Sequence, residues 1–206
     1  MSSLENADTA NTSYHHGDLR KSLLTAATQM INESGVEAVS MRKLADIVGV
    51  SRTALYHHFA GKQALLCALA ETGFNQQRQH LQAVLKQSEE LSPRLLIKAY
   101  IAAYIDFAVA NPAYYGLMFG QDIWKTAGAN DQLTDTAKRA FKNYVDTIAA
   151  WQNKGIVSNK YEALRFAQVS WGTLHGISRL MIDGIYIEQL PQQETIDTVV
   201  SLFMAE

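Results

Sequence analysis

The chain has 206 residues, enough for one large or two small domains, and its 48% hydrophobic and 18% charged residues are ordinary for a folded globular protein. This composition excludes an intrinsically unfolded chain. The formal net charge of −2 does not by itself indicate a nucleic-acid-binding protein, since such proteins usually carry a basic excess.

The charge is nevertheless unevenly distributed along the chain. Residues 14–62 hold six basic side chains, namely Arg20, Lys21, Arg42, Lys43, Arg52 and Lys62. The same stretch holds four acidic ones, namely Asp18, Glu33, Glu37 and Asp46. Residues 14–62 therefore carry an excess of basic side chains, and the rest of the chain carries an excess of acidic ones.

The compartment is indicated by the single cysteine and by the apolar runs. One cysteine, Cys67, cannot form an internal disulfide and fits a reducing compartment. The first residues have no apolar signal segment, and the longest apolar run, Ala99 to Ala110, is interrupted by Asp106 and is too short to span a bilayer. We therefore expect a cytoplasmic protein without a membrane partner.

The N-terminal segment is expected to precede the folded part. Residues 1–13 are polar and aperiodic, which predicts a disordered arm. His15 and His16 invite a metal hypothesis, but adjacent histidines lack the separation of a chelating pair and no cysteine or acidic cluster completes a site. We expect no metal here and favour an arm that lies against DNA or the first helix. That helix is predicted by an apolar stripe that ends at Gly35: Leu19, Leu23, Ala26, Ala27, Met30 and Ile31.

The stretch from Ser40 to Lys62 predicts a helix-turn-helix. An apolar stripe at i, i+3, i+4 and i+7 indicates a short helix that Ser40 can cap: Met41, Leu44, Ala45 and Val48. Gly49 ends this helix, because glycine reaches a positive φ without a steric clash. Ser51 caps a second helix whose inward residues are Leu55 and Phe59. Such a pair of helices can lay its second helix in a DNA major groove.

The outward side chains of this motif suit double-stranded DNA. Arg52 can contact guanine from the N-terminal end of the second helix, Thr53 offers a hydroxyl and a methyl, and Arg42 can approach from the first helix. The donors expected to grip phosphate are Ser40, Ser51, Tyr56, His57 and Lys62. The alternative from the pattern alone is a small helical hairpin with a solvated polar face.

These residues carry a resemblance to a known family. The run from Met41 through AxxVGVSxxxLYxHFxxK resembles the DNA-binding signature of the TetR family of transcriptional regulators, and with Tyr14 to Gly35 the match covers about the first third of the chain. The resemblance implies base-facing positions at Arg42, Arg52, Thr53 and Ala54. It implies backbone-gripping positions at Ser40, Ser51, Tyr56, His57 and Lys62.

An amphipathic segment from Lys62 to about Gln87 predicts a long connecting helix. Its expected inner side consists of Leu66, Leu69, Ala70, Phe74, Leu81, Val84 and Leu85. Because it begins beside the predicted recognition helix and ends within the second domain, it is the natural mechanical link between the two. Cys67 near its start is either an exposed redox sensor or a small buried core residue, and we favour the buried residue.

The remaining residues, 88–206, predict a second helical domain. Pro93, Pro112 and Pro191 each precede a periodic segment and are expected to mark helix starts, where proline removes no hydrogen bond. Between them we expect a loop from Ala127 to Asp131 that leads into a helix with a stop at Gly155. Another is expected to begin at Ser158 or Asn159 and to end at about Asp183.

This domain offers no catalytic pattern. It has no glycine-rich phosphate loop, no Ser/His/Asp arrangement and no metal-ligand spacing, so we expect neither an enzyme nor a cofactor. Its aromatic and methionine side chains at helical spacing form either a plain core or a ligand cavity. The polar tips of its tyrosines favour the cavity. The expected lining residues are Tyr100, Tyr104, Phe107, Tyr115, Met118, Phe119, Phe141, Tyr144, Trp171 and His175.

The segment Trp171-Gly172-Thr173-Leu174-His175-Gly176 adds a candidate contact between subunits. Gly172 and Gly176 share a face that another helix can approach closely, and this pattern, with Asn111 to Tyr115, resembles a C-terminal domain type of some TetR-family proteins. His175 is either a polar or pH-sensitive contact in a pocket or a hydrogen-bonded core histidine. The expected dimer interface consists of Gly172, Leu174, Gly176, Ile177, Met181, Ile196, Val199, Val200 and Phe203.

These patterns together predict an all-α protein. Its parts are a three-helix DNA-binding domain at 14–61, a connecting helix at 62–87 and an effector-binding and dimerisation domain at 88–206. We expect a homodimeric repressor that a small molecule releases from a palindromic operator. The alternatives are a ligand-independent architectural DNA-binding protein and a helical enzyme with an appended helix-turn-helix.

Overall fold

The computed structural model describes residues 16–88, 90–124, 128–186 and 192–204. The chain divides into two compact units, residues 1–60 and 61–206. The predicted arm at 1–13, with His15, lies outside the described residues. Within the described ranges no cluster of three or more histidine, cysteine or acidic side chains could hold a metal ion.

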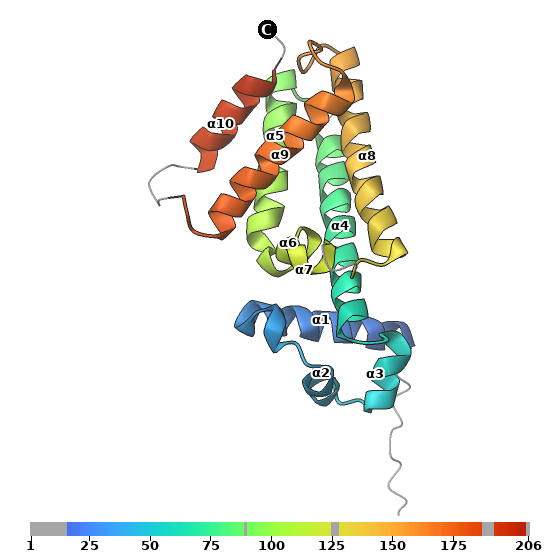
Figure 1. The fold of residues 1–206 in the computed structure, drawn as a ribbon. Coiled ribbons are helices and arrows are strands. Elements are labelled where there is room, and N and C mark those ends of the chain that lie inside the picture. The colour runs from blue at the N-terminus through green and yellow to red at the C-terminus, as the bar shows by residue number, and fades with distance from the viewer. Residues whose placement is uncertain (1–15, 89, 125–127, 187–191, 205–206) are drawn as a thin grey trace, which may run out of the picture. The chain divides into compact units, whose positions relative to one another are not determined.

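The first unit consists of short helices around a small apolar core (Figure 1). They are α1 (His16–Ser34), the 3₁₀ turn η1 (Val36–Ala38), α2 (Met41–Val48) and α3 (Arg52–His58). Gly35 ends α1 as predicted, with a φ of 79° and its N–H donating to the Ile31 carbonyl at 2.8 Å. Leu23, Leu44 and Leu55, one from each α-helix, have no exposed surface. The predicted inward faces of these helices therefore meet in one core.

The second unit is a helical bundle built around α4. Its elements are α4 (Lys62–Gln87), α5 (Pro93–Ala110), α6 (Pro112–Met118), α7 (Gln121–Trp124), α8 (Asp131–Asn153), α9 (Ala163–Ile182) and α10 (Gln192–Phe203). Helix α4 packs on α5, α6 and α8, while α5 also packs on α9 and α10. The chain is all-α, as predicted. Helix α4 has the predicted bounds, and Pro93 and Pro112 begin helices as predicted, while Pro191 lies outside the described residues.

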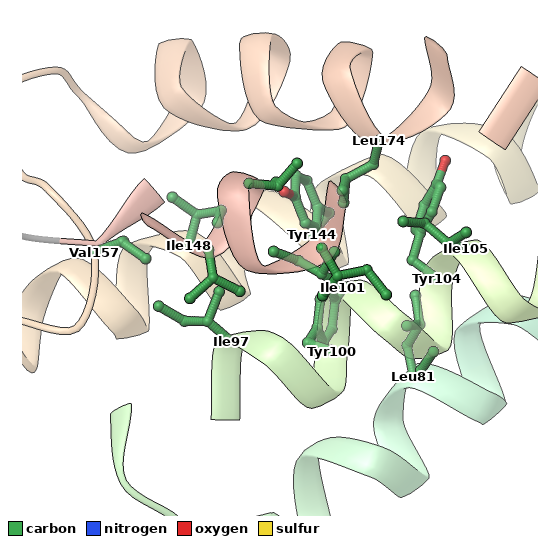
Figure 2. Packing of buried hydrophobic residues seen from close by; sticks show 14 of the residues in the cluster. Leu81, Ile97, Tyr100, Ile101, Tyr104, Ile105, Tyr144, Ile148, Val157 and Leu174 are labelled. Atoms are coloured by element: carbon green, nitrogen blue, oxygen red, sulfur yellow. The ribbon is translucent and has the colours of Figure 1, made fainter. Parts of the chain in front are cut away.

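Helix α5 is buried around most of its circumference. Ile97, Tyr100, Tyr104 and Phe107 lie on one face, and Ile101, Ala103 and Ile105 on other sides are buried as well. Figure 2 shows Ile97, Tyr100, Ile101, Tyr104 and Ile105 of α5 in one cluster with Leu81 of α4 and Tyr144 of α8. The reason is that neighbouring helices cover α5 on several sides, so most of its circumference must be apolar.

Close packing of α4 on α6 depends on one glycine. A Cβ atom at Gly73 would lie 2.7 Å from Met118 Sδ and 3.1 Å from Tyr114 Cβ. Contacts of that length require a shift of the neighbouring atoms, and Met118 is fully buried. Gly73 therefore sets how near the two helices come.

Helix α9 begins later than predicted. The expected start at Ser158 or Asn159 is wrong, because that segment is held in extended form beside the end of α10. Val157 forms an isolated bridge with Met204, and the Ser158 N–H donates to the Phe203 carbonyl at 3.3 Å. Gln152 donates to the carbonyls of Ser158 at 2.8 Å and of residue 161 at 2.9 Å. The first α9 residue is Ala163.

Four residues expected in the dimer interface belong instead to the core of the single chain. Leu174 and Val200 are fully buried, and Ile196 and Val199 are 2% and 4% exposed. Their assignment to a surface ridge is a misassignment, because α5 and its neighbours already cover this side of α9 and α10. A second subunit cannot contact side chains that have no exposed surface.

Two further features of the second unit concern Cys67 and the membrane. Cys67 is buried, as favoured, and its S–H donates to the Gly128 carbonyl at 3.2 Å. No single helix in the described ranges is long and apolar enough to cross a membrane. The pair α5 and α6 reaches that length and composition only when joined across a 100° bend.

Candidate nucleic-acid interface and effector cavity

The turn between α2 and α3 is fixed by its caps. The Ser40 hydroxyl accepts a hydrogen bond from the Lys43 N–H at 3.5 Å, and the Ser51 hydroxyl accepts one from the Ala54 N–H at 3.1 Å. Gly49 lies between the helices in the left-handed region, with a φ of 73°, where a side chain would be strained. The predicted caps and turn are therefore present.

The side chains predicted to contact DNA mostly project from the first unit. Arg42, Arg52, Thr53 and His57 are exposed, and Tyr56 is 51% exposed although it is a large aromatic. Ser51 is exposed as well, while Ser40 and Ala54 are half-buried. Arg52 is the first residue of α3, the end that base-reading helices commonly direct at base edges.

Ser51 and Lys62 carry hydrogen-bond donors on either side of the predicted recognition helix. The Ser51 oxygen accepts the Ala54 amide, which leaves its O–H free to donate to a phosphate. Lys62 is the first residue of α4 and belongs to the second unit. The structure also shows a cation–π contact that was not predicted from the sequence. The Arg20 guanidinium lies 5.3 Å from the centre of the buried Phe59 ring.

Many of the predicted cavity residues are joined by hydrogen bonds. Trp171 Nε1 donates to the Tyr104 hydroxyl at 2.7 Å, the Tyr104 and Tyr115 hydroxyls lie 3.2 Å apart, and the Tyr115 hydroxyl lies 2.9 Å from His175 Nδ1. This chain crosses from α9 through α5 and α6 and returns to α9. The polar tips of the two buried tyrosines are thereby satisfied within the protein.

The other predicted aromatics pack around that chain. Phe141 stacks on Trp171 with ring centres 4.8 Å apart, and Phe119 lies 4.5 Å from the His175 ring. Tyr144 donates to the Ser170 hydroxyl at 2.9 Å. Phe107 lies apart from this group, against His80 at 6.5 Å.

Burial keeps these groups uncharged. Desolvation raises the pKa of Tyr115 and Tyr144 from 10.0 to about 12, and it also raises the pKa of Tyr100 and Tyr104. Burial, with a smaller contribution from Arg179, lowers the pKa of His175 below 6.5. At neutral pH the cluster therefore presents phenol hydroxyls and a neutral imidazole.

A cavity of about 200 Å³ lies between α4, α5 and α8, with Trp171 of α9 in its wall. Four predicted residues line it: Tyr100, Tyr104, Tyr144 and Trp171. Sequence reasoning missed Gln77, which also lines the cavity and is only 4% exposed. Its amide nitrogen has no hydrogen-bond partner within the described part of the chain. The other predicted residues divide between two shallower grooves: one holds Phe119, Phe141, Trp171 and His175, and the other holds Met118, Phe119, Phe141 and Trp171.

Both halves of the chain match described protein families. The model of "Bacterial regulatory proteins, tetR family" matches residues 23–69, and that of "Tetracyclin repressor-like, C-terminal domain" matches residues 97–203. The chain belongs to the TetR family. It is therefore a DNA-binding transcriptional regulator of the TetR type, and the resemblance seen in the sequence is confirmed.

Individual TetR-family relatives are similar over different extents. The tetracycline repressor protein class A from transposon 1721 of Escherichia coli is 45% identical over 58 residues, which are 28% of this chain and 27% of that repressor. The nucleoid occlusion factor SlmA of Serratia proteamaculans is 28% identical over 145 residues, 67% of this chain and 71% of that protein. A solved structure of a protein with unknown function from Rhodococcus sp. RHA1 is 33% identical, with a TM-score of 0.77 over 93% of this chain and 94% of that one.

Proposed function

We propose that this TetR-family protein is a homodimeric repressor that leaves a palindromic operator when a small molecule enters the cavity of the second unit. Support comes from the likeness to proteins named as tetracycline repressors. That likeness spans only about a quarter of the repressors' length, 27% and 24%. Because the chromosome of a bacterium lies in its cytoplasm, we place the protein there.

The observation that carries this proposal is the position of the cavity on α4. Phe74, Gln77 and Leu81 of α4 line the cavity, and the same helix begins at Lys62, directly after the DNA-binding unit in the chain. A ligand that binds one position of α4 more tightly than another can shift the population of DNA-competent molecules. We assign recognition to 14–61, coupling to 62–87, and effector binding and dimerisation to 88–206.

The proposed DNA contacts follow from the exposed face of the first unit. Arg42, Arg52, Thr53 and Ala54 are assigned to base edges. Ser40, Ser51, Tyr56, His57 and Lys62 are assigned to phosphates. One helix-turn-helix reads few base pairs, so two copies on half-sites about 34–36 Å apart are expected.

The proposed dimer surface uses the exposed sides of α9 and α10. Val169 and Leu202 are each 71% exposed, and Tyr161 is 59% exposed. With Phe203 they line a groove of about 390 Å³. Added Cβ atoms at Gly172 and Gly176 would meet nothing within 4 Å, so a partner helix has space there. Ile177 and Met181, which follow on the same helix, are half-buried. Exposed apolar surface of this kind favours self-association.

The experiment that tests the function begins with selection of duplexes from a random pool by the full-length protein. We expect an inverted repeat to be enriched, and Arg52→Ala to relax the base preference at one position of each half-site. A small-molecule library is then screened for compounds that raise the melting temperature. Compounds that do so should release the selected duplex. Enrichment of no motif, or stabilising compounds that never alter operator affinity, would contradict the proposal.

A second candidate is an architectural DNA-binding protein that needs no ligand. It is favoured by the similarity to SlmA, which covers more of the chain than the repressor matches do. Chromosome-wide mapping distinguishes the two functions: a repressor should occupy few sites near promoters, and an architectural protein many sites independent of genes. Neither family model describes an enzyme, so the alternative of a helical enzyme receives no support from them.

A further inference from the structure

The effector cavity shares part of its wall with a second, polar hollow beside α4 and α8. Phe74, Arg78, Ala140 and Asn143 line both spaces. The second hollow has about 330 Å³ and is completed by Asn75, Thr136 and Arg139. A ligand in the first cavity would therefore lie beside side chains, Arg78 among them, that also line the second.

The second hollow is cationic. Its lining contains Arg78 and Arg139 and no acidic side chain. Arg78 donates to Gln82 at 3.1 Å and Arg139 to Thr136 at 3.1 Å, so the partners found for both guanidinium groups within the described ranges are neutral. The acid that borders the first cavity, Asp146, is already paired with Lys142 at 2.6 Å. Two guanidinium groups without a counter-charge favour an anion, and arginine matches the planar geometry of a carboxylate.

The first cavity combines an aromatic wall with polar side chains. Its wall holds the rings of Tyr100, Tyr104, Tyr144 and Trp171. Tyr100 and Tyr144 stack with centres 6.0 Å apart, and burial keeps both phenols neutral by raising their pKa. The buried Gln77 amide nitrogen also faces this cavity's lining, and it has no hydrogen-bond partner among the residues that the structure describes. A ligand oxygen in this cavity would supply the missing acceptor.

The size of the first cavity limits the apolar part of the ligand. An apolar cavity of about 150 Å³ accommodates benzene, so about 200 Å³ accommodates one substituted ring. We propose that the effector is a small aromatic carboxylate. Its ring lies among the tyrosines and Trp171, its carboxylate contacts Arg78 and Arg139, and Gln77 donates to one of its oxygens. This assignment of a ligand class rests on the proposed function.

The test is calorimetric titration of the full-length protein with three acids, benzoate, phenylacetate and 3-phenylpropanoate, and with their neutral primary amides. We expect at least one acid to bind at least about tenfold more tightly than its amide, a factor that corresponds to about 1.4 kcal/mol. Arg78→Gln and Arg139→Gln should each remove most of that preference, because they should weaken binding of the acid far more than binding of the amide. Arg165→Gln is the matched control, because Arg165 lines a different groove.

The contradicting outcomes are equally definite. The ligand class is wrong if no acid binds, if each amide binds as tightly as its acid, or if Arg165→Gln has the same effect as Arg139→Gln. Operator affinity is measured in the same titrations. An acid that binds with the expected charge preference but leaves operator affinity unchanged would contradict release by an effector and not the ligand class. Release by neutral amides alone would contradict the ligand class and not the release mechanism.

Discussion

At the scale of single residues, Arg52 and Lys62 represent two kinds of proposed DNA contact. Arg52 is exposed at the first position of α3, where a guanidinium can form two hydrogen bonds to guanine. Lys62 can neutralise a phosphate, which is the same in every sequence. Loss of each side chain should therefore affect binding to specific and to random DNA differently.

We expect Arg52→Ala to weaken binding to the selected operator by about 1–3 kcal/mol and to relax the base preference at one position. Lys62→Ala should weaken binding to operator and random duplex alike and reduce the slope of log affinity against log salt by about one. Fluorescence anisotropy at several salt concentrations measures both quantities. Equal losses on the two duplexes in both variants would show that Arg52 does not contact bases.

His175 should make stability depend on pH in the acidic range. Its pKa in the folded chain is lowered below 6.5 by burial and then by Arg179. As the pH falls through about 6.5, the unfolded chain takes up a proton that the folded chain does not, so the unfolded state gains relative stability. The stabilising contribution is therefore complete above the unfolded pKa and declines below it.

We expect the free energy of unfolding of the wild type, relative to that of His175→Gln, to be constant well above pH 6.5 and to fall on the acidic side. Urea unfolding at a series of pH values and one protein concentration measures this difference. The free energies of unfolding of the two proteins should also differ by a constant amount at every pH, because the variant alters the hydrogen bond between His175 and Tyr115. A difference that stays constant down to pH 5 would mean that the folded pKa of His175 is not lowered.

At the scale of helices, sequence reasoning predicted well the features that depend on local signals. Ser40, Gly49 and Ser51 act through their own backbone neighbours, so the turn between α2 and α3 could be predicted from the sequence. The start of α9 could not be predicted in this way. Ser158 resembles an N-cap, but its backbone is held by Phe203, which is distant in sequence, and by Gln152, which lies in α8. The close approach at Gly73 likewise depends on a partner helix.

We expect Gly73→Ala to destabilise the second unit by about 1–3 kcal/mol, the usual cost of overpacking a buried contact. The physical reason is the 2.7 Å approach of the new methyl group to Met118 Sδ. Gly116→Ala is the matched control, since its Cβ would meet nothing within 4 Å, and it should be neutral or slightly stabilising in α6. Thermal and urea unfolding measure both effects.

The assigned cause can be checked with a double variant. If the clash with Met118 is responsible, Gly73→Ala combined with Met118→Ala should cost less than the sum of the two single changes. Additive costs would show that the added methyl group acts elsewhere.

At the scale of the whole molecule, an apolar periodicity shows that one face of a helix is covered, but it does not show which helix or subunit covers it. The stripe through Leu174, Val199 and Val200 was assigned to a second subunit, whereas α5 of the same chain covers it. The lining of the cavity proposed for the effector could be predicted only in part, for a similar reason. The polar tips of the tyrosines indicate a cavity, whereas Gln77 and Arg78 belong to α4 and line the cavity only because α4 packs against α5 and α8. What a second copy can contact is the opposite side of α9 and α10.

The last prediction concerns that surface. In a two-fold interface each substitution occurs twice, so Val169→Glu or Leu202→Glu would bring two carboxylates into an apolar contact. We expect the dimer dissociation constant to rise by about 100-fold or more, since like charges in an interface cost several kcal/mol. Gly176→Trp should also raise the dissociation constant. The protomer leaves open space at Gly176, and the indole would fill the space that the partner helix is expected to occupy. Analytical ultracentrifugation without DNA measures the change.

Operator binding should be lost in the same variants although the DNA-binding unit is untouched, because a monomer presents only one recognition helix. Val109→Glu is the control: Val109 is 43% exposed on α5 and does not line the groove, so this variant should remain dimeric and bind the operator normally. Circular dichroism should show unchanged helix content in all four proteins, since the substituted positions lie on the protomer surface. A wild type that sediments as a monomer at micromolar concentration, or a Val169→Glu variant that dimerises and binds a palindrome normally, would show that the two subunits meet elsewhere.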